Sequence, residues 1–104
     1  MFIVCVAACP TGIAHTYMAA EALEMLGKKN GWEIKVETQG STGIENEITE
    51  DDIARADGAI IATEILIDGV ERFELLTKLE CSVADPIKQP DAVYNTMMHL
   101  INNK

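Results

Sequence analysis

A cysteine and a histidine six residues apart are the side chains of this sequence best placed to do chemistry. They belong to the segment Cys9-Pro10-Thr11-Gly12-Ile13-Ala14-His15-Thr16. An apolar run over residues 2–8 precedes the segment and a helical pattern follows it, which predicts a loop between a buried strand and a helix N-terminus. Backbone N–H groups and the helix dipole favour anions at such a loop, and they also favour the nucleophilic thiolate form of cysteine. Cys9 is therefore a candidate nucleophile, and residues 10–16 are a candidate phosphate cradle.

The spacing of this pair can be compared with that of cysteine phosphatases, which use Cys-x5-Arg. There the guanidinium holds two phosphate oxygens at once, a grip that a histidine cannot copy. Here Thr11, His15 and Thr16 can each offer a single hydrogen bond, and Gly12 lets the backbone approach an anion closely. The loop thus predicts a phosphate site without the strongest clamp. On spacing alone, His15 is equally well interpreted as a capping or packing residue.

Length and composition limit the classes of protein to consider. A chain of 104 residues can bury one modest core, so we expect a single domain over residues 1–104. The net charge of −9, with eight scattered lysines and arginines, argues against nucleic acid as a partner. The apolar start lacks the flanking features of a signal peptide or a membrane span, so we expect no direct membrane insertion.

The cysteine count points to the compartment and to the absence of a metal. Three cysteines without Cys-x2-Cys spacing fit neither a disulfide framework nor a zinc site. We therefore expect a reducing cytoplasm, no metal and no organic cofactor. Cys5 and Cys81 lie in predicted strands and are interpreted as structural thiols, and His99 is interpreted as a surface residue.

The elements that must position the loop alternate between strands and helices. We predict strands over residues 2–8, 32–38, 58–63 and 78–84, and helices over residues 14–29, 49–56, 70–76 and 90–101. This alternation predicts an α/β fold, a three-layer αβα arrangement with a four-stranded parallel sheet in the order 2-1-3-4. Ligands bind where such a sheet reverses direction, and the Cys9 loop and the Thr63-Glu64 loop both open there. Residues 39–48 are expected to be a loop that either lines this site or is merely solvated.

Side-chain patterns predict how two of these elements are buried. In the helix over residues 14–29, one apolar stripe comprises Ala14, Met18, Ala22, Met25 and Leu26, so its methionines are expected to fill the core. In the strand over residues 32–38, Trp32, Ile34 and Val36 alternate with Glu33, Lys35 and Glu37. This alternation predicts a half-exposed strand near the sheet edge, with the charged side chains in solvent. Thr49-Glu50-Asp51-Asp52 is typical of a capped helix start.

The residues around Cys9 also resemble a known family. The run from Ala8 to Thr16, followed by Met18-Ala19-Ala20-Glu21-Ala22-Leu23, resembles the signature of the fructose-type IIB component of the bacterial sugar phosphotransferase system. The resemblance continues through Val36-Glu37-Thr38-Gln39-Gly40-Ser41, Gly43-Ile44-Glu45-Asn46 and Glu71-Arg72-Phe73.

This resemblance implies a phosphocarrier. In that family the cysteine at the position of Cys9 takes a phosphoryl group from a phosphohistidine on the IIA component. It then passes the group to a sugar, here fructose or a similar one, held by the membrane-embedded IIC component. The implied location is cytoplasmic, with peripheral attachment to the membrane through IIC. Two alternatives remain open: a small cysteine phosphatase or arsenate reductase-like hydrolase, disfavoured by the lack of arginine at position 15, and a regulatory binding domain in which Cys9 is dispensable.

Overall fold

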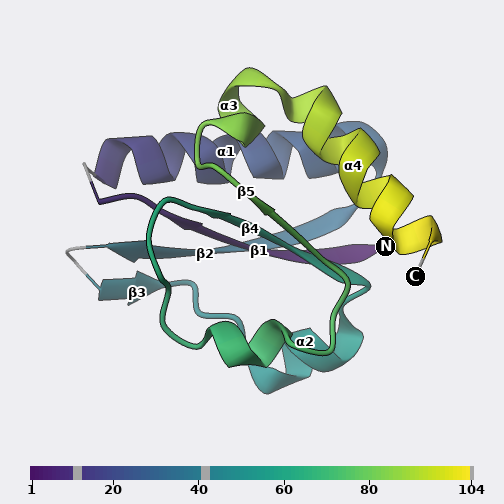
Figure 1. The fold of residues 1–104 in the computed structure, drawn as a ribbon, viewed down its shortest axis with the longest axis horizontal. Coiled ribbons are helices and arrows are strands. Elements are labelled where there is room, and N and C mark those ends of the chain that lie inside the picture. Colours follow the sequence, from purple (N-terminus) through teal and green to yellow (C-terminus); the bar gives the residue numbers. More distant parts are fainter. Residues whose placement is uncertain (11–12, 41–42, 104) are drawn as a thin grey trace.

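A computed structural model describes residues 1–10, 13–40 and 43–103 of the chain. Within them, strands β1 to β5 span Phe2–Ala8, Glu33–Gly40, Gly43–Glu45, Gly58–Thr63 and Lys78–Cys81. The helices are α1 (Ile13–Asn30), α2 (Glu50–Arg55), α3 (Asp85–Lys88) and α4 (Pro90–Asn102), with a 3-10 helix η1 over Val70–Phe73. Figure 1 shows the sheet between two helical layers, with α1, α3 and α4 on one face and α2 on the other.

The described sheet has five strands in the order β3-β2-β1-β4-β5. β1 pairs in parallel with β2 and β4, and β4 pairs in parallel with β5, whereas β3 is antiparallel to β2. The prediction of a four-stranded, fully parallel sheet in the order 2-1-3-4 is therefore wrong, although the α/β class holds. Residues 39–48, expected to be a loop, contribute the end of β2 and all of β3, with Gly40 opposite Gly43. Strand β2 is consequently covered along part of its outer edge.

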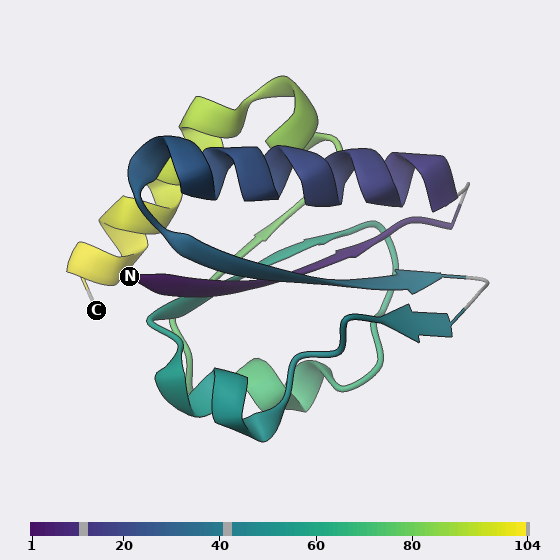
Figure 2. The same cartoon turned by 180° about the vertical axis from the view of Figure 1, so that it is seen from behind.

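Strand β1 lies at the centre of the fold, and all seven of its residues are buried. Its side chains alternate between two separate apolar clusters, as expected for a strand covered on both faces. Ile3, Cys5 and Ala7 belong to the cluster under α1 and α4, whereas Val4 and Val6 belong to the cluster beneath, with Phe73. The reverse view in Figure 2 shows the two helical layers on either side of the sheet. The sheet centre is thus a rigid base for the loop that follows β1.

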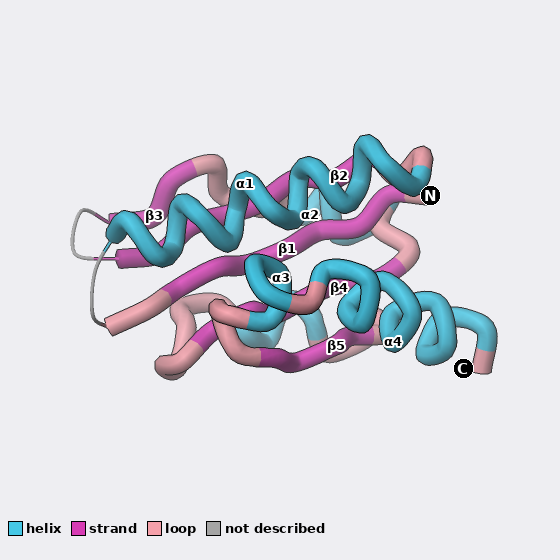
Figure 3. The backbone as a smooth tube through the Cα atoms, turned by 90° about the horizontal axis from the view of Figure 1, so that it is seen from above, coloured by secondary structure: helices cyan, strands magenta, loops and turns pink. Residues whose placement is uncertain are grey.

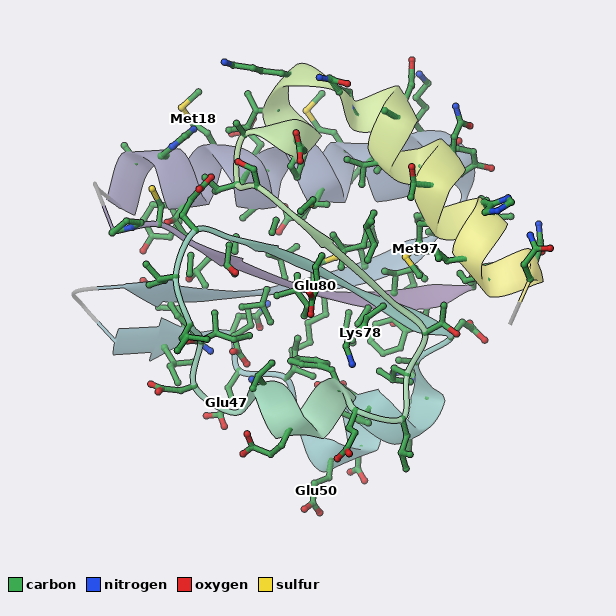
Figure 4. All side chains as sticks on the ribbon, in the orientation of Figure 1. Met18, Glu47, Glu50, Lys78, Glu80 and Met97 are labelled. Carbon is green, nitrogen blue, oxygen red and sulfur yellow. The ribbon has the colours of Figure 1, made fainter. Side chains whose placement is uncertain are left out.

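Helix α1 buries a different face from the predicted one. Its described residues with buried side chains, spaced three or four apart, are Thr16, Ala19, Leu23 and Leu26, and Gly27 is buried beside Leu26. Met18 is 54% exposed and Met25 is 62% exposed, so the prediction that these methionines fill the core is wrong. Figure 4 shows Met18 pointing away from the sheet, in contrast to Met97, which points from α4 toward it. The small side chain of Ala19, fully buried against β1, lets α1 lie close to the sheet on this face.

Helices α2 and α4 begin within one residue of the predicted starts, whereas the short helix α3 was not predicted. Thr49 caps α2, as the sequence predicts, and it also forms a capping box with Asp52. The predicted helix over residues 70–76 is only the 3-10 turn η1. Strand β5 ends at Cys81 rather than at residue 84, because the Ser82 N–H donates to the Asp85 carboxylate at 3.0 Å and Asp85 then begins α3, with Pro86 in its first turn. Across the described residues, no helix has the length and apolar character needed to cross a bilayer.

Candidate active site

Cys9 directly follows β1, at the end of the molecule where the parallel strands terminate. The view in Figure 3 places the end of β1 and the start of α1 at this same end. Cys9 is 9% exposed and lines an open cavity of about 200 Å³ together with Pro10, His15, Glu64 and Val83. These residues come from the exits of β1, β4 and β5 and from the first turn of α1. The expectation that the Cys9 loop and the Thr63-Glu64 loop share one crevice is therefore confirmed.

The closest polar contact described between two side chains of this cavity joins Cys9 and His15. The Cys9 Sγ lies 3.8 Å from the His15 Nδ1. With a proton on Nδ1, the imidazole donates to a thiolate or to an anion bound beside it; without that proton, it accepts from the thiol. The six-residue spacing thus brings together the two side chains that the sequence singled out. At this distance, the His15 Nδ1–H group can donate a hydrogen bond to the sulfur when the sulfur carries negative charge.

Glu64 connects the exits of three strands. Its backbone N–H donates to the Ala8 carbonyl at 3.2 Å, which fixes the start of the β4 exit beside Cys9. Its carboxylate accepts a hydrogen bond from the Ser82 hydroxyl. The sequence patterns did not indicate Ser82 or Val83, since both were assigned to the interior of a longer strand. Because a carboxylate repels a bound phosphate, Glu64 opposes tight retention of an anion in this cavity.

The other predicted phosphate-binding residues differ in their placement. Pro10 and Ala14 are exposed, Ile13 is the first residue of α1, and Thr11 and Gly12 lie outside the described residues. Thr16 is 2% exposed, and its hydroxyl has no hydrogen-bond partner among the described residues. Helix α1 has 18 residues and no acid in its first turn. Its dipole therefore favours negative charge at the position of Cys9 without a carboxylate of its own to compete.

The other two cysteines are poor nucleophiles. Cys5 is fully buried in β1, and this burial raises the pKa of its thiol far above the usual value. Burial also raises the pKa of Cys81 to about 12, with the nearby Asp85 acting in the same direction. Both thiols are protonated at neutral pH, and only a thiolate attacks efficiently. Their interpretation as structural residues agrees with these surroundings.

A buried ion pair between β2 and η1, outside the Cys9 cavity, was not predicted. Glu37, expected in solvent, is 0% exposed and accepts from Arg72 through both carboxylate oxygens, at 2.8 and 3.0 Å. Burial acts to raise the pKa of Glu37, but hydrogen bonds from Arg72, Gln39 and the Ile48 N–H outweigh it and hold that pKa below its usual value. Alternation within β2 could not indicate this pair, because the partner lies 35 residues away. β3 and the loop after it cover the Glu37 side chain, which would be exposed if β2 were the edge strand of the sheet.

Comparison with known proteins agrees with this fold. The family model described as "PTS system, Lactose/Cellobiose specific IIB subunit" matches residues 4–96. The chain therefore belongs to the IIB subunit family of the sugar phosphotransferase system, and it is a phosphotransferase component of sugar transport.

Several of the similar proteins are named as fructose-type or fructose-like components. The "PTS system fructose-like EIIB component 2" of Escherichia coli K12 is 53% identical over 91 residues, which cover 88% of this chain and 86% of that protein. A crystal structure described as a predicted fructose-specific IIB from Escherichia coli superposes with a TM-score of 0.92 at 41% identity, covering 96% of this chain and 88% of that one. The resemblance to fructose-type IIB components is confirmed.

A longer relative contains this unit as one segment. The "PTS system fructose-specific EIIABC component" of Mycoplasma pneumoniae is 43% identical over 105 residues, which cover 97% of this chain and 15% of that protein. The name of that protein joins the A, B and C components in a single chain.

Proposed function

We propose that residues 1–104 act as one IIB-type domain that carries a phosphoryl group on Cys9 between a IIA component and a sugar held by a IIC component. The observation that carries this proposal is the placement of Cys9 in a cavity at the N-terminus of α1, in contact with His15. The names of its relatives point to fructose or a similar sugar as the acceptor. The domain works on the cytoplasmic side of the membrane, attached through IIC.

The proposed phosphoryl-transfer cycle consists of two nucleophilic displacement reactions at phosphorus. The Cys9 thiolate attacks the phosphorus of the phosphohistidine, so that a P–N bond breaks, an S–P bond forms and the imidazole of the donor is released. In the second step a sugar hydroxyl attacks the phosphocysteine, an O–P bond forms and the thiolate leaves. The hydroxyl proton passes to a base on the acceptor side. Such reactions ask a protein mainly for positioning and for stabilisation of charge on the phosphoryl oxygens.

Residues around Cys9 are suited to both demands. The N-terminal N–H groups and the dipole of α1 favour the negative charge of the phosphoryl group. His15 Nδ1, at 3.8 Å from the sulfur, is placed to donate to that group or to the leaving thiolate. Glu64 lines the same cavity with a negative charge, which destabilises the phosphorylated state and favours its delivery to an acceptor.

The two arginines of the chain favour a carrier over a hydrolase. A cysteine phosphatase needs a guanidinium to clamp the phosphate while water attacks. Arg72 is paired with the buried Glu37, and Arg55 is paired with Glu33 on the surface. Neither arginine lines the cavity that contains Cys9.

Substitution of each cysteine tests the proposal. Cys9→Ser should abolish acceptance of labelled phosphate from a phosphorylated fructose-type IIA component, because an alcohol is barely ionised at neutral pH. Cys5→Ala and Cys81→Ala are the matched controls and should retain acceptance if they fold, as checked by circular dichroism. Retention of label by folded Cys9→Ser, or its loss in folded Cys5→Ala, would overturn the assignment.

A further inference from the structure

The outer edge of strand β5 is open. β5 is the last strand of the described sheet, within which it pairs only with β4, and Figure 3 shows it as the outermost strand on its side. The Ala59 N–H donates to the Thr77 carbonyl at 2.9 Å, and the backbone groups of successive residues alternate between the two edges of a strand. Thr77 and Leu79 therefore face β4. The N–H and carbonyl groups of Lys78 and Glu80 face outward, where the described sheet offers no partner, and such an edge is a template for a further strand.

Open hollows lie on both faces of this edge. On the face of α4, the lining of a hollow of about 260 Å³ includes Leu79, Cys81, Ala92, Val93 and Thr96. On the opposite face, the lining of a hollow of about 220 Å³ includes Glu80, Ile61, Ile67 and Val70. Because successive side chains of a strand point to opposite faces of the sheet, a strand added beside β5 would direct its side chains alternately toward the two hollows. The edge therefore has space for a further strand on both faces.

Two opposite charges lie on the open edge. Lys78 and Glu80 are two residues apart in β5, so both side chains lie on the same face of the sheet, and Figure 4 shows them on the side of α2. Within the described part of the chain, neither side chain takes part in an ion pair. A lysine on an edge strand usually prevents further pairing, because a second strand would leave its charge without a partner. A strand that brings a carboxylate to Lys78 and an ammonium group to Glu80 removes this obstacle.

A second copy of β5 supplies these two charges in the required order. A two-fold symmetric extension of the sheet makes the two β5 strands antiparallel, and residues with outward-facing backbone groups must then lie opposite one another. One such register places Lys78 of each copy opposite Glu80 of the other. The neighbouring registers place Lys78 opposite Lys78, or Glu80 opposite Glu80, and like charges directly opposite are destabilising. The complementary register also places Leu79 opposite Leu79 at the two-fold axis, on the face of α4.

We propose that the chain forms a homodimer in which the two β5 strands pair antiparallel and extend the sheet across both copies. The two Lys78–Glu80 pairs fix the register, and Leu79 packs against Leu79 of the second copy. Because β5 has only four residues, the interface is small and the dimer dissociates reversibly. The cavity of Cys9 lies at the carboxyl ends of the parallel strands, so the antiparallel arrangement places the two cavities at opposite ends of the dimer. Dimerisation therefore does not depend on phosphoryl transfer and leaves both cavities away from the interface.

Charge reversal tests both the pairing and its register. Sedimentation equilibrium of the parent at an ionic strength of about 0.15 M should show a reversible dimer with a Kd below about 1 mM. Lys78→Glu and Glu80→Lys should each raise this Kd about tenfold or more, because each creates two like-charge pairs across the interface. The double variant Lys78→Glu/Glu80→Lys should return to the Kd of the parent, because its cross-strand pairs are again opposite in sign. The two single changes shift the net charge of −9 in opposite directions, so overall repulsion cannot weaken the dimer in both.

A covalent trap tests the residue at the two-fold axis. Residues directly opposite in a non-hydrogen-bonded antiparallel pair have Cα atoms about 4.5 Å apart, which a disulfide can span. Under mild oxidation, Leu79→Cys should therefore give a dimer that peptide mapping shows to be linked through position 79. Leu75→Cys is the matched control: Leu75 is 97% exposed but lies outside β5, so this variant should be linked at least about tenfold more slowly.

Several outcomes would overturn the proposal. A parent that stays monomeric up to about 1 mM would do so, as would a dimer whose Kd neither single reversal raises. A Kd raised by Lys78→Glu but lowered by Glu80→Lys would assign the effect to net charge and contradict the register. A double variant that remains as weak as the single variants contradicts the cross-strand pairs, and linkage of Leu75→Cys as fast as that of Leu79→Cys contradicts the position of the axis.

Discussion

Substitution of Arg72 by methionine tests the reasoning on the buried hydrogen-bond network around Glu37. The guanidinium donates five hydrogen bonds, two to Glu37 and one each to the carbonyls of Ile48, Asp68 and Gly69. Methionine keeps much of the apolar stem and removes all five. Glu37 then remains as a buried carboxylate with only Gln39 and the Ile48 N–H as donors.

The expected loss follows from this unpaired charge. Breaking a buried ion pair by removing one partner costs about 3–5 kcal/mol, which is a large part of the roughly 5–15 kcal/mol that stabilises a typical domain. Arg55→Met is the matched control, because Arg55 and Glu33 are both more than half exposed and such pairs contribute about 0–1 kcal/mol. Urea unfolding followed by circular dichroism at neutral pH measures both variants.

The dependence on pH gives a second, independent check. In the parent, the pKa of Glu37 lies below its usual value, so this group stabilises the fold above the unfolded pKa of about 4.3 and loses that contribution as the pH falls through the folded pKa. In Arg72→Met, burial is no longer offset by the guanidinium, and protonation relieves the buried charge. The difference in unfolding free energy between the parent and Arg72→Met should therefore shrink as the pH is lowered from about 7 to about 5. A deficit below about 1 kcal/mol at neutral pH, or one that grows on acidification, would refute the reasoning.

Three further predictions concern the site and the packing of α1. His15→Ala should slow phosphoryl transfer to Cys9 by about 10- to 1,000-fold in rapid-quench kinetics at an unchanged urea midpoint, and an unchanged rate would return His15 to a packing role. Iodoacetamide near neutral pH should leave Cys5 and Cys81 unmodified in peptide maps of the folded protein, because the pKa of each thiol is raised; labelling of both before unfolding would contradict this. Leu23→Ala should cost about 2–5 kcal/mol and Met25→Ala less than about 0.5 kcal/mol, and equal costs would contradict the observed buried face of α1.

Local patterns in the sequence predict the part of the fold that carries the candidate site. The apolar run of β1, the loop at Cys9 and the helix α1 are contiguous, so periodicity alone indicates a strand followed by a helix. Cys9 and His15 come together because the loop between them is short. Glu64 joins them because parallel strands end at the same edge of a sheet.

Features that depend on distant partners were missed. Strand β3 has only three residues, all of them exposed, and forms because it pairs with the end of β2, so neither an apolar run nor alternation indicates it. Glu37 follows the alternation of a half-exposed strand, and only the approach of Arg72 and the loop after β3 buries it. In α1, alanines and methionines occur on several sides of the helix, so the sequence is compatible with two different buried faces. The contact with β1 selects the one through Ala19 and Leu23.

The most direct test of the central claim, that Cys9 is a phosphocarrier, is mass analysis of the chain after incubation with phosphorylated fructose-type IIA. Intact mass should rise by one phosphoryl group, and fragmentation should place that group on Cys9. The modified form should persist for many minutes in buffer, because the cavity has no arginine clamp, and should lose its phosphate quickly when dephosphorylated IIA, or IIC with sugar, is added. Phosphate on another residue, rapid loss to water, or turnover of an aryl phosphate that Cys9→Ser abolishes would contradict the account.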